Sequence, residues 1–127
     1  MSLSFNTGQF GEDLVLNHYL NLGYKLVAKN FEYRNSHTRG RLGEIDLIMT
    51  KDNKVHLIEV KTRNNLQLGT GLESITKSKL DLLYKTFQYF LSKKEFIIYR
   101  NYFAQFDIAV VNNSNINIIF NGYSFDR

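Results

Sequence analysis

The sequence predicts an α/β sandwich in which helices cover a mixed central β-sheet, and three observations support this fold class. Two segments carry apolar residues at helical spacing, and several others have the apolar character of strands. The two segments that flank residues 51–54 have apolar residues on both faces, as is typical of strands covered on two sides. In the first of them, Ile45, Leu47 and Met49 are expected on one face and Ile48 on the other. With 127 residues, of which 43% are hydrophobic, the chain fits one domain over residues 1–127.

The first helix is expected over residues 6–22, because Gly23 is a typical helix terminator and the inner face has helical spacing. Glu12 lies on the same predicted face as Val15 and Leu16. A carboxylate on an apolar face is uncommon unless it is paired or bound to something. Two explanations stay open for Glu12, a functional role and an interaction with the helix dipole near the N-terminus.

The other elements follow from hydrophobic period and turn residues. Strands are predicted over residues 25–33, 42–50 and 54–63, a second helix over 72–91, and short strands over 96–99, 104–111 and 116–120. The order is therefore helix, three strands, helix and further strands.

Composition narrows the functional classes. The net charge of +4 and the pI near 9.3 are compatible with a nucleic-acid partner, although many small basic proteins bind none. Without cysteine, the chain has neither a disulfide framework nor a cysteine-based zinc site, which fits a cytoplasmic protein. No apolar stretch approaches the ~20 residues that span a bilayer, so no membrane association is expected.

A predicted hairpin carries the most informative charges. If its loop is centred within residues 51–54, Asp46 lies opposite Glu59 and Glu44 lies opposite Lys61. Opposed side chains in an antiparallel pair have Cβ atoms roughly 4.5–5.5 Å apart, where like charges repel. Two carboxylates at that distance require a cation between them.

This layout is typical of a metal-dependent site for phosphodiester hydrolysis. Mg²⁺ is commonly held by one or two carboxylates, so Asp46 and Glu59 are candidate ligands. Lys61 is either a general base or a positive charge that stabilises the transition state. In the structural alternative, Lys61 and Arg63 neutralise the acids in a surface ladder of salt bridges.

Other polar residues give weaker signals. The three histidines show no metal-ligand spacing, and we expect His56 to pack on a half-exposed strand. Basic residues that could contact DNA phosphates, or simply form a solvated surface, are Arg34, Arg39, Arg41, Arg63, Lys77 and Lys79.

The sequence resembles the YraN-like bacterial proteins over nearly its whole length. The motifs that carry the resemblance are Gly11-Glu12-Asp13, Gly23-Tyr24, Lys29-Asn30-Phe31, Gly43-Glu44-Ile45-Asp46-Leu47-Ile48, Glu59-Val60-Lys61-Thr62-Arg63, Gly69, Lys79 and Phe106-Asp107. That family is placed in the restriction-endonuclease-like PD-(D/E)xK superfamily, and archaeal Holliday-junction resolvases have a similar skeleton.

The resemblance implies a restriction-endonuclease-like core in the order α-β-β-β-α-β-β. It also implies that Asp46, Glu59 and Lys61 are catalytic, that Glu12 is the acid contributed by the first helix, and that the Val60 carbonyl is a metal ligand.

The chain departs from the family pattern in two places. Gln105 stands where the family often has an arginine, which puts a phosphate contact there in doubt, and the polar segment before Gly43 is longer than usual.

The hairpin and the resemblance together predict a Mg²⁺- or Mn²⁺-dependent DNA endonuclease, with branched or damaged DNA as candidate substrates. A homodimer is one arrangement that could cut two strands. Two other classes stay open, a DNA-binding module that keeps the fold without cleavage and a protein-interaction domain with a structural acid cluster.

Overall fold

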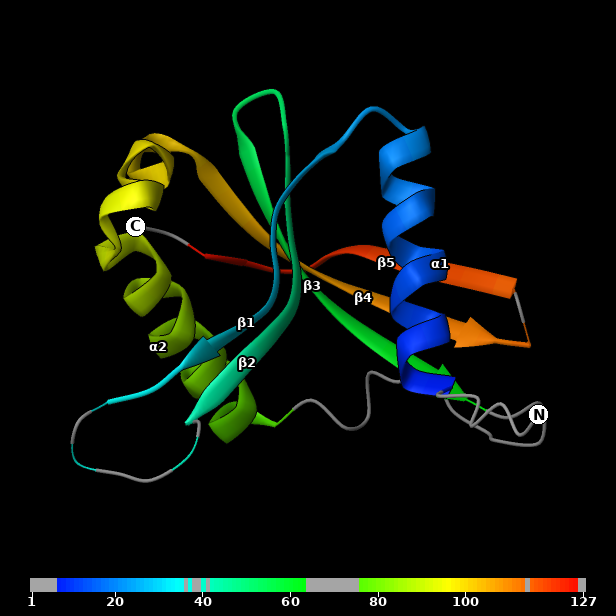
Figure 1. The fold of residues 1–127 in the computed structure, drawn as a ribbon, viewed down its shortest axis with the longest axis horizontal. Coiled ribbons are helices and arrows are strands. Elements are labelled where there is room, and N and C mark those ends of the chain that lie inside the picture. The colour runs from blue at the N-terminus through cyan, green and yellow to red at the C-terminus, as the bar shows by residue number, and fades with distance from the viewer. Residues whose placement is uncertain are drawn as a thin grey trace, which may run out of the picture.

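One five-stranded sheet runs through the molecule, and helices lie on its two sides (Figure 1). The computed structural model describes residues 7–35, 37, 40, 42–63, 76–113 and 115–125. The elements are α1 (Thr7–Asn21), β1 (Lys25–Tyr33), β2 (Gly43–Lys51), β3 (Lys54–Arg63), α2 (Lys77–Ser92), the 3-10 helix η2 (Lys94–Asn101), β4 (Phe103–Asn112) and β5 (Asn115–Phe125). This order confirms the predicted α-β-β-β-α-β-β arrangement.

The sheet is mixed, as predicted. Its strand order is β1-β2-β3-β4-β5, and β3 and β4 are parallel, whereas the other neighbours are antiparallel. A parallel pair needs a crossover connection, and α2 lies in the one between β3 and β4. Among the described residues, no helix has the length and apolar character needed to span a bilayer.

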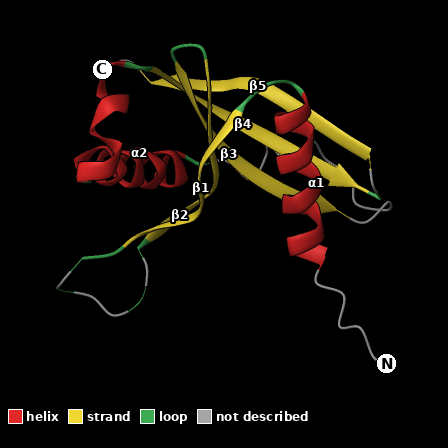
Figure 2. Ribbon diagram, turned by 45° about the horizontal axis from the view of Figure 1, so that its top comes forward, coloured by secondary structure: helices red, strands yellow, loops and turns green. Residues whose placement is uncertain are grey.

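Each face of the sheet has its own hydrophobic core, which confirms the predicted cover on two sides (Figure 2). On the α2 side, the largest buried side chains are Phe87, Phe90, Ile48, Leu57, Phe106 and Ile108. On the α1 side, they are Val15, Tyr19, Leu47, Met49 and Ile58. The core of the molecule is therefore split by the sheet into two layers.

The turn between β2 and β3 lies where the sequence predicted it. Pairs run from Lys51–Lys54 to Leu47–Ile58, so the loop is centred between Asp52 and Asn53. Asp52 has a φ of 56°, in the left-handed region that Asp and Asn tolerate better than most residues. Turn chemistry therefore fixes the register of the hairpin.

The predicted position of Ile45 is wrong. The sequence pattern put it on the face of Leu47 and Met49, but it packs in the α2-side core together with Ile48. Residues three apart share a face only if strand alternation is interrupted between them. The interruption coincides with the point where the pairing between β2 and β3 ends, on the N-terminal side of Leu47.

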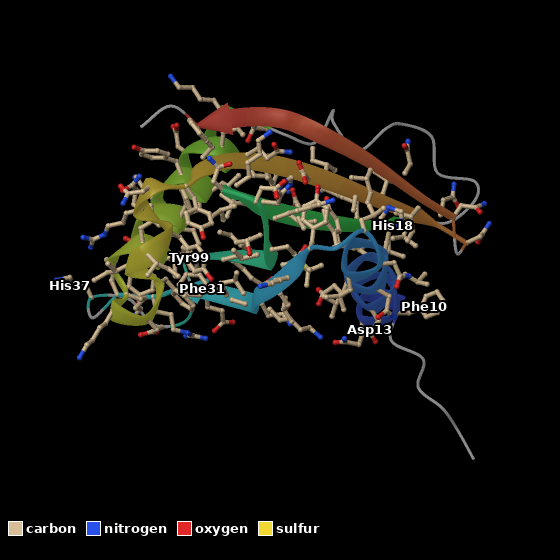
Figure 3. The ribbon with its side chains drawn as sticks, turned by 90° about the horizontal axis from the view of Figure 1, so that it is seen from above. Phe10, Asp13, His18, Phe31, His37 and Tyr99 are labelled. Carbon is tan, nitrogen blue, oxygen red and sulfur yellow. The ribbon has the colours of Figure 1, made fainter. Side chains whose placement is uncertain are left out.

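The predicted strand over residues 96–99 is also wrong, because this segment belongs to the 3-10 helix η2. Phe96, Tyr99 and Tyr102 pack against the α2-side core and recur every three residues, the period of a 3-10 helix. Tyr99 and Phe31 lie at this end of the molecule, away from the α1 residues labelled in Figure 3. Ile97 and Ile98 stay exposed, so the apolar residues of this run do not alternate between two faces as they would in a strand.

The remaining bounds differ at the ends. α2 begins at Lys77 after the cap residue Thr76, so the predicted helix start at residue 72 lies outside the described residues. β5 continues to Phe125, five residues beyond the predicted end at 120.

A buried carboxylate ties α1 to the centre of the sheet. Asp107 is fully buried, and its Oδ2 accepts a hydrogen bond from the Tyr19 hydroxyl at 2.8 Å and lies 2.7 Å from His56 Nδ1. Its Oδ1 accepts a hydrogen bond from Gln105 Nε2 at 2.8 Å. His56 is 4% exposed, and its neighbours Val55, Leu57 and Ile58 are buried, so the expectation of a half-exposed strand here is wrong. The reason is the partner Asp107 on the neighbouring strand, which local sequence does not reveal.

Replacing this carboxylate should destabilise the fold. Asp107→Ala leaves Tyr19, His56 and Gln105 without a shared acceptor, so the free energy of unfolding should fall by about 3–5 kcal/mol. Urea denaturation measures the change, with the exposed Asp81→Ala as the matched control. A loss within about 0.5 kcal/mol, the usual range for a surface substitution, would show that the network contributes no stability.

Candidate functional site

The predicted acids lie where β2 and β3 separate. The backbone ladder ends at Leu47–Ile58, one step before Asp46 and Glu59 would face each other. Instead, Asp46 Oδ2 accepts a hydrogen bond from the Val60 backbone amide at 2.8 Å. The predicted direct pairing of Asp46 with Glu59 in the ladder is therefore wrong. The reason is that the Val60 amide of β3 bonds to the side chain of Asp46 and not to the backbone of β2.

The two acids nevertheless line the same cavity, which has a volume of about 270 Å³. Its polar residues include Glu44, Asp46, Glu59 and Lys79, and its apolar wall comes largely from α2. The lining residues of α2 are Lys79, Leu80, Leu82, Leu83 and Thr86. Asp46 and Glu59 therefore share a cavity because β2 and β3 separate, and not because the two residues pair in the sheet.

Two glycines allow the helices to approach this region closely. A Cβ atom on Gly11 of α1 would collide with the Thr62 hydroxyl on β3. A Cβ atom on Gly43, at the start of β2, would collide with the Thr86 hydroxyl on α2. Each helix therefore packs beside the strands at a distance that only glycine permits.

Two lysines hold one oxygen of Glu59. Lys79 Nζ lies 2.8 Å and Lys61 Nζ 3.4 Å from Glu59 Oε1. The other oxygen, Oε2, is buried and has no hydrogen-bond partner. A buried acceptor without a donor is destabilising, so this oxygen is a suitable position for a cation ligand. Lys79 was predicted as a DNA contact, and its bond to Glu59 was not foreseen.

The pKa of Lys61 is lowered, first by burial and then by its neighbour Lys79, against the opposing charge of Glu59. For Lys79, burial acts to lower the pKa, but the contacts with Glu59 and Lys61 outweigh it and the pKa is raised. Lys61 therefore loses its proton more readily than Lys79, although both amines contact the same carboxylate. A lowered pKa is the direction that a general base requires.

Glu44 lies beside Asp46 rather than opposite Lys61. Burial raises the pKa of Asp46 from 3.8 to about 6, and the charge and hydrogen bond of Glu44 and the charge of Glu59 add to the rise. The hydrogen bond from Val60 acts in the other direction. The predicted pairing of Glu44 with Lys61 is wrong, because the ladder has already ended. The i, i+2 spacing of Glu44 and Asp46 on one strand was the available signal.

α1 brings Glu12 into the electrostatic field of the site. The pKa of Glu12 is raised by burial and by the charge of Asp46, while Lys29 and a hydrogen bond with Asn30 lower it. Glu12 lies beyond the first turn of α1, which contains no acid. Because the dipole effect falls off within the first turn, it explains Glu12 poorly. Proximity to Asp46 fits the functional explanation better.

Of the other predicted phosphate contacts, the described side chains of Arg34 and Lys77 do not line the cavity. Arg34 is exposed and forms a salt bridge with Glu32 at 2.9 Å. Lys77 is exposed at the start of α2. Arg39, Arg41 and the side chain of Arg63 lie outside the described part of the chain.

The carboxylates at the site suit a hard divalent cation that takes only a few ligands from the protein. Within the described ranges, no three His, Cys, Asp or Glu side chains form a group that could hold a metal ion. Mg²⁺, however, usually keeps several waters and is bound by only one or two carboxylates. Asp46 and the unpartnered Oε2 of Glu59 meet that requirement.

Removing the charge of Asp46 should stabilise the metal-free protein. Because its pKa is higher in the folded state, the folded state binds more protons and gains stability as pH falls. Asp46→Asn should therefore be more stable than the parent at pH 8, by on the order of 1–3 kcal/mol.

The advantage should disappear between about pH 6 and pH 4, when Asp46 becomes protonated. Thermal unfolding in the presence of a chelator measures this stability difference at each pH. Because the parent and the variant both contain the facing acids Glu12, Glu44 and Glu59, the difference between them isolates the contribution of Asp46. Asp81→Asn is the exposed control. A pH-independent difference would contradict the prediction.

Comparison with known proteins identifies the family. Residues 11–111 match the uncharacterised protein family UPF0102. A UPF0102 protein of Clostridium botulinum (strain Kyoto / Type A2) is 37% identical over 112 residues, which cover 87% of this chain and 84% of that protein. UPF0102 proteins of Sulfurihydrogenibium sp. and Persephonella marina are 32% and 31% identical over 119 and 123 residues. These two alignments cover 94% and 97% of this chain, and 95% and 97% of those proteins. The chain therefore belongs to the UPF0102 family.

Proposed function

We propose that this protein is a metal-dependent DNA endonuclease of the PD-(D/E)xK superfamily. The observation that carries the proposal is the cavity that receives Asp46 and Glu59 from separating strands, with Lys61 on the same carboxylate as Lys79. Acids on two neighbouring strands with a lysine two residues after the second acid form the arrangement that the resemblance implies. The element order α-β-β-β-α-β-β is also the expected one.

Each residue has a distinct proposed role. Asp46, Glu59 and the Val60 carbonyl would hold Mg²⁺ or Mn²⁺. When bound, such an ion would neutralise charge on the scissile phosphate and on the leaving oxygen. Lys61 would accept a proton from the attacking water, consistent with its lowered pKa. Glu12 would add negative charge at the α1 side of the site.

DNA is the proposed substrate class because the chain is basic and the site suits phosphodiester chemistry. The net charge is +4, and at the start of α2 Lys77 is exposed and the partly exposed Lys79 lines the cavity. Branched or damaged DNA and a homodimer are proposals that the same experiments address.

One observation favours a second candidate function, a DNA-binding module without cleavage. Lys61 and Lys79 together already neutralise Glu59 Oε1, as a structural ion pair would. The described residues also include no metal-holding group of three acids or histidines. We rank the enzyme first because the second oxygen of Glu59 is buried without a partner.

A substrate panel tests the enzyme. With Mg²⁺ or Mn²⁺, the parent should cleave supercoiled, single-stranded or branched DNA, and Glu59→Gln and Lys61→Met should reduce the rate by about 100-fold or more. Lys85→Met, an exposed change of the same charge on α2, should keep the parent rate. Gel assays at matched protein concentration measure these rates.

The outcomes separate the three classes. Equal rates for the parent and both site variants would trace the activity to a contaminant. Salt-dependent DNA binding without cleavage on any substrate would establish the binding module. If DNA does not bind at low salt, the acid cluster is structural.

A further inference from the structure

Lys79 is the only cation at Glu59 that comes from outside β3 among the described residues. Lys61 lies two residues from Glu59 on the same strand, so its distance is set by the backbone of β3. Lys79 comes from the first turn of α2, after a crossover connection. Its Nζ–Oε1 distance of 2.8 Å is also the shorter one, against 3.4 Å for Lys61.

The backbone of Lys79 is held by a helix cap. Thr76 Oγ1 accepts a hydrogen bond from the Lys79 amide at 3.1 Å, which fixes the first turn of α2 beside the cavity. The Lys79 side chain is 40% exposed, whereas the Glu59 side chain is 22% exposed. The ammonium group therefore contacts a mostly buried carboxylate, although the Lys79 side chain as a whole remains partly exposed.

An ammonium ion and a divalent ion cannot both be close to one carboxylate without strong mutual repulsion. At short range and reduced dielectric, like charges repel far more strongly than in water. Lys79 therefore neutralises Glu59 when no metal is present, and it opposes a metal ion bound at the same carboxylate. Glu59 Oε2, buried and without a partner, is the oxygen left for that ion.

We propose that Lys79 is a positioning residue whose ammonium group moves from Glu59 to a DNA phosphate when DNA binds. This movement couples metal binding to DNA binding. The inference rests on the proposed function, because it assumes that Glu59 is a metal ligand. Without DNA, Lys79 stays on Glu59 and weakens metal binding. When DNA is bound, the Lys79 ammonium group donates a hydrogen bond to a phosphate near the cavity, and the Glu59 carboxylate becomes available to the metal ion. Divalent ions and DNA should then each increase the affinity of the other.

Metal binding without DNA gives the first test, because it does not depend on activity. Mn²⁺ titration by calorimetry should show binding at least about fivefold tighter for Lys79→Met than for the parent. Lys79→Arg keeps a cation at Glu59 and should bind like the parent, and Lys85→Met controls for the loss of charge. Helix propensity is similar for Lys and Met, and a cooperative thermal transition for each variant checks that it is folded.

The reciprocal measurement gives the second test. For the parent, DNA binding measured with Ca²⁺ against chelator should strengthen by at least about fivefold, and Lys79→Met should lose this gain. The ratio of affinities with and without Ca²⁺ is the readout, because a lysine that merely contacts phosphate would weaken both states equally and leave the ratio unchanged.

The outcomes distinguish this inference from the proposed function. Unchanged or weaker Mn²⁺ binding in Lys79→Met, in a protein whose cleavage still requires Glu59, would overturn the role of Lys79 alone. Mn²⁺ binding that appears only in Lys79→Met would support it. Absence of Mn²⁺ binding in the parent and in every variant would overturn both proposals.

Discussion

The hydrogen bond from the Val60 amide to the Asp46 carboxylate is the interaction on which the site depends. A strand cannot leave its partner without orphaning backbone groups, and buried orphans are destabilising. Here the carboxylate of Asp46 satisfies the Val60 amide at 2.8 Å, so the part of β2 that precedes Leu47 can separate from β3. The space that opens is the cavity. Asp46, the acid that keeps it open, is largely buried, and this burial raises its pKa.

The two helices complete the site from opposite sides of the sheet. Gly11 allows α1 to pack against β3 and brings Glu12 close enough to affect the pKa of Asp46. Gly43 allows α2 to pack against the start of β2, and the first turn of α2 supplies Lys79. These side chains lie far apart in sequence, and both interact electrostatically with Asp46 because each face of the sheet carries one helix (Figure 1).

Stability and chemistry are divided between two parts of the sheet. Around Asp107, the side chains of Tyr19, His56 and Gln105 all direct polar atoms at one fully buried carboxylate. Around Glu59, two amines share one oxygen and the other oxygen has no partner. A well-satisfied network in one part can support unfavourable electrostatics in another, which is the usual relation between scaffold and functional site.

Local sequence determined the elements, their order and the turn of the β2–β3 hairpin, because periodicity and turn chemistry act over a few residues. It also brought Asp46 and Glu59, which line one cavity, and Lys61, which contacts Glu59, into one candidate site, although the predicted ladder pairs do not form. It failed where partners lie far along the chain. His56 is buried because of Asp107, Phe96 follows a 3-10 period against the α2-side core, and the separation of β2 moves Ile45 to the other face. Only the tertiary structure decided that Lys79 reaches Glu59, because that contact depends on how α2 packs across the sheet, and packing geometry is not encoded in any local pattern.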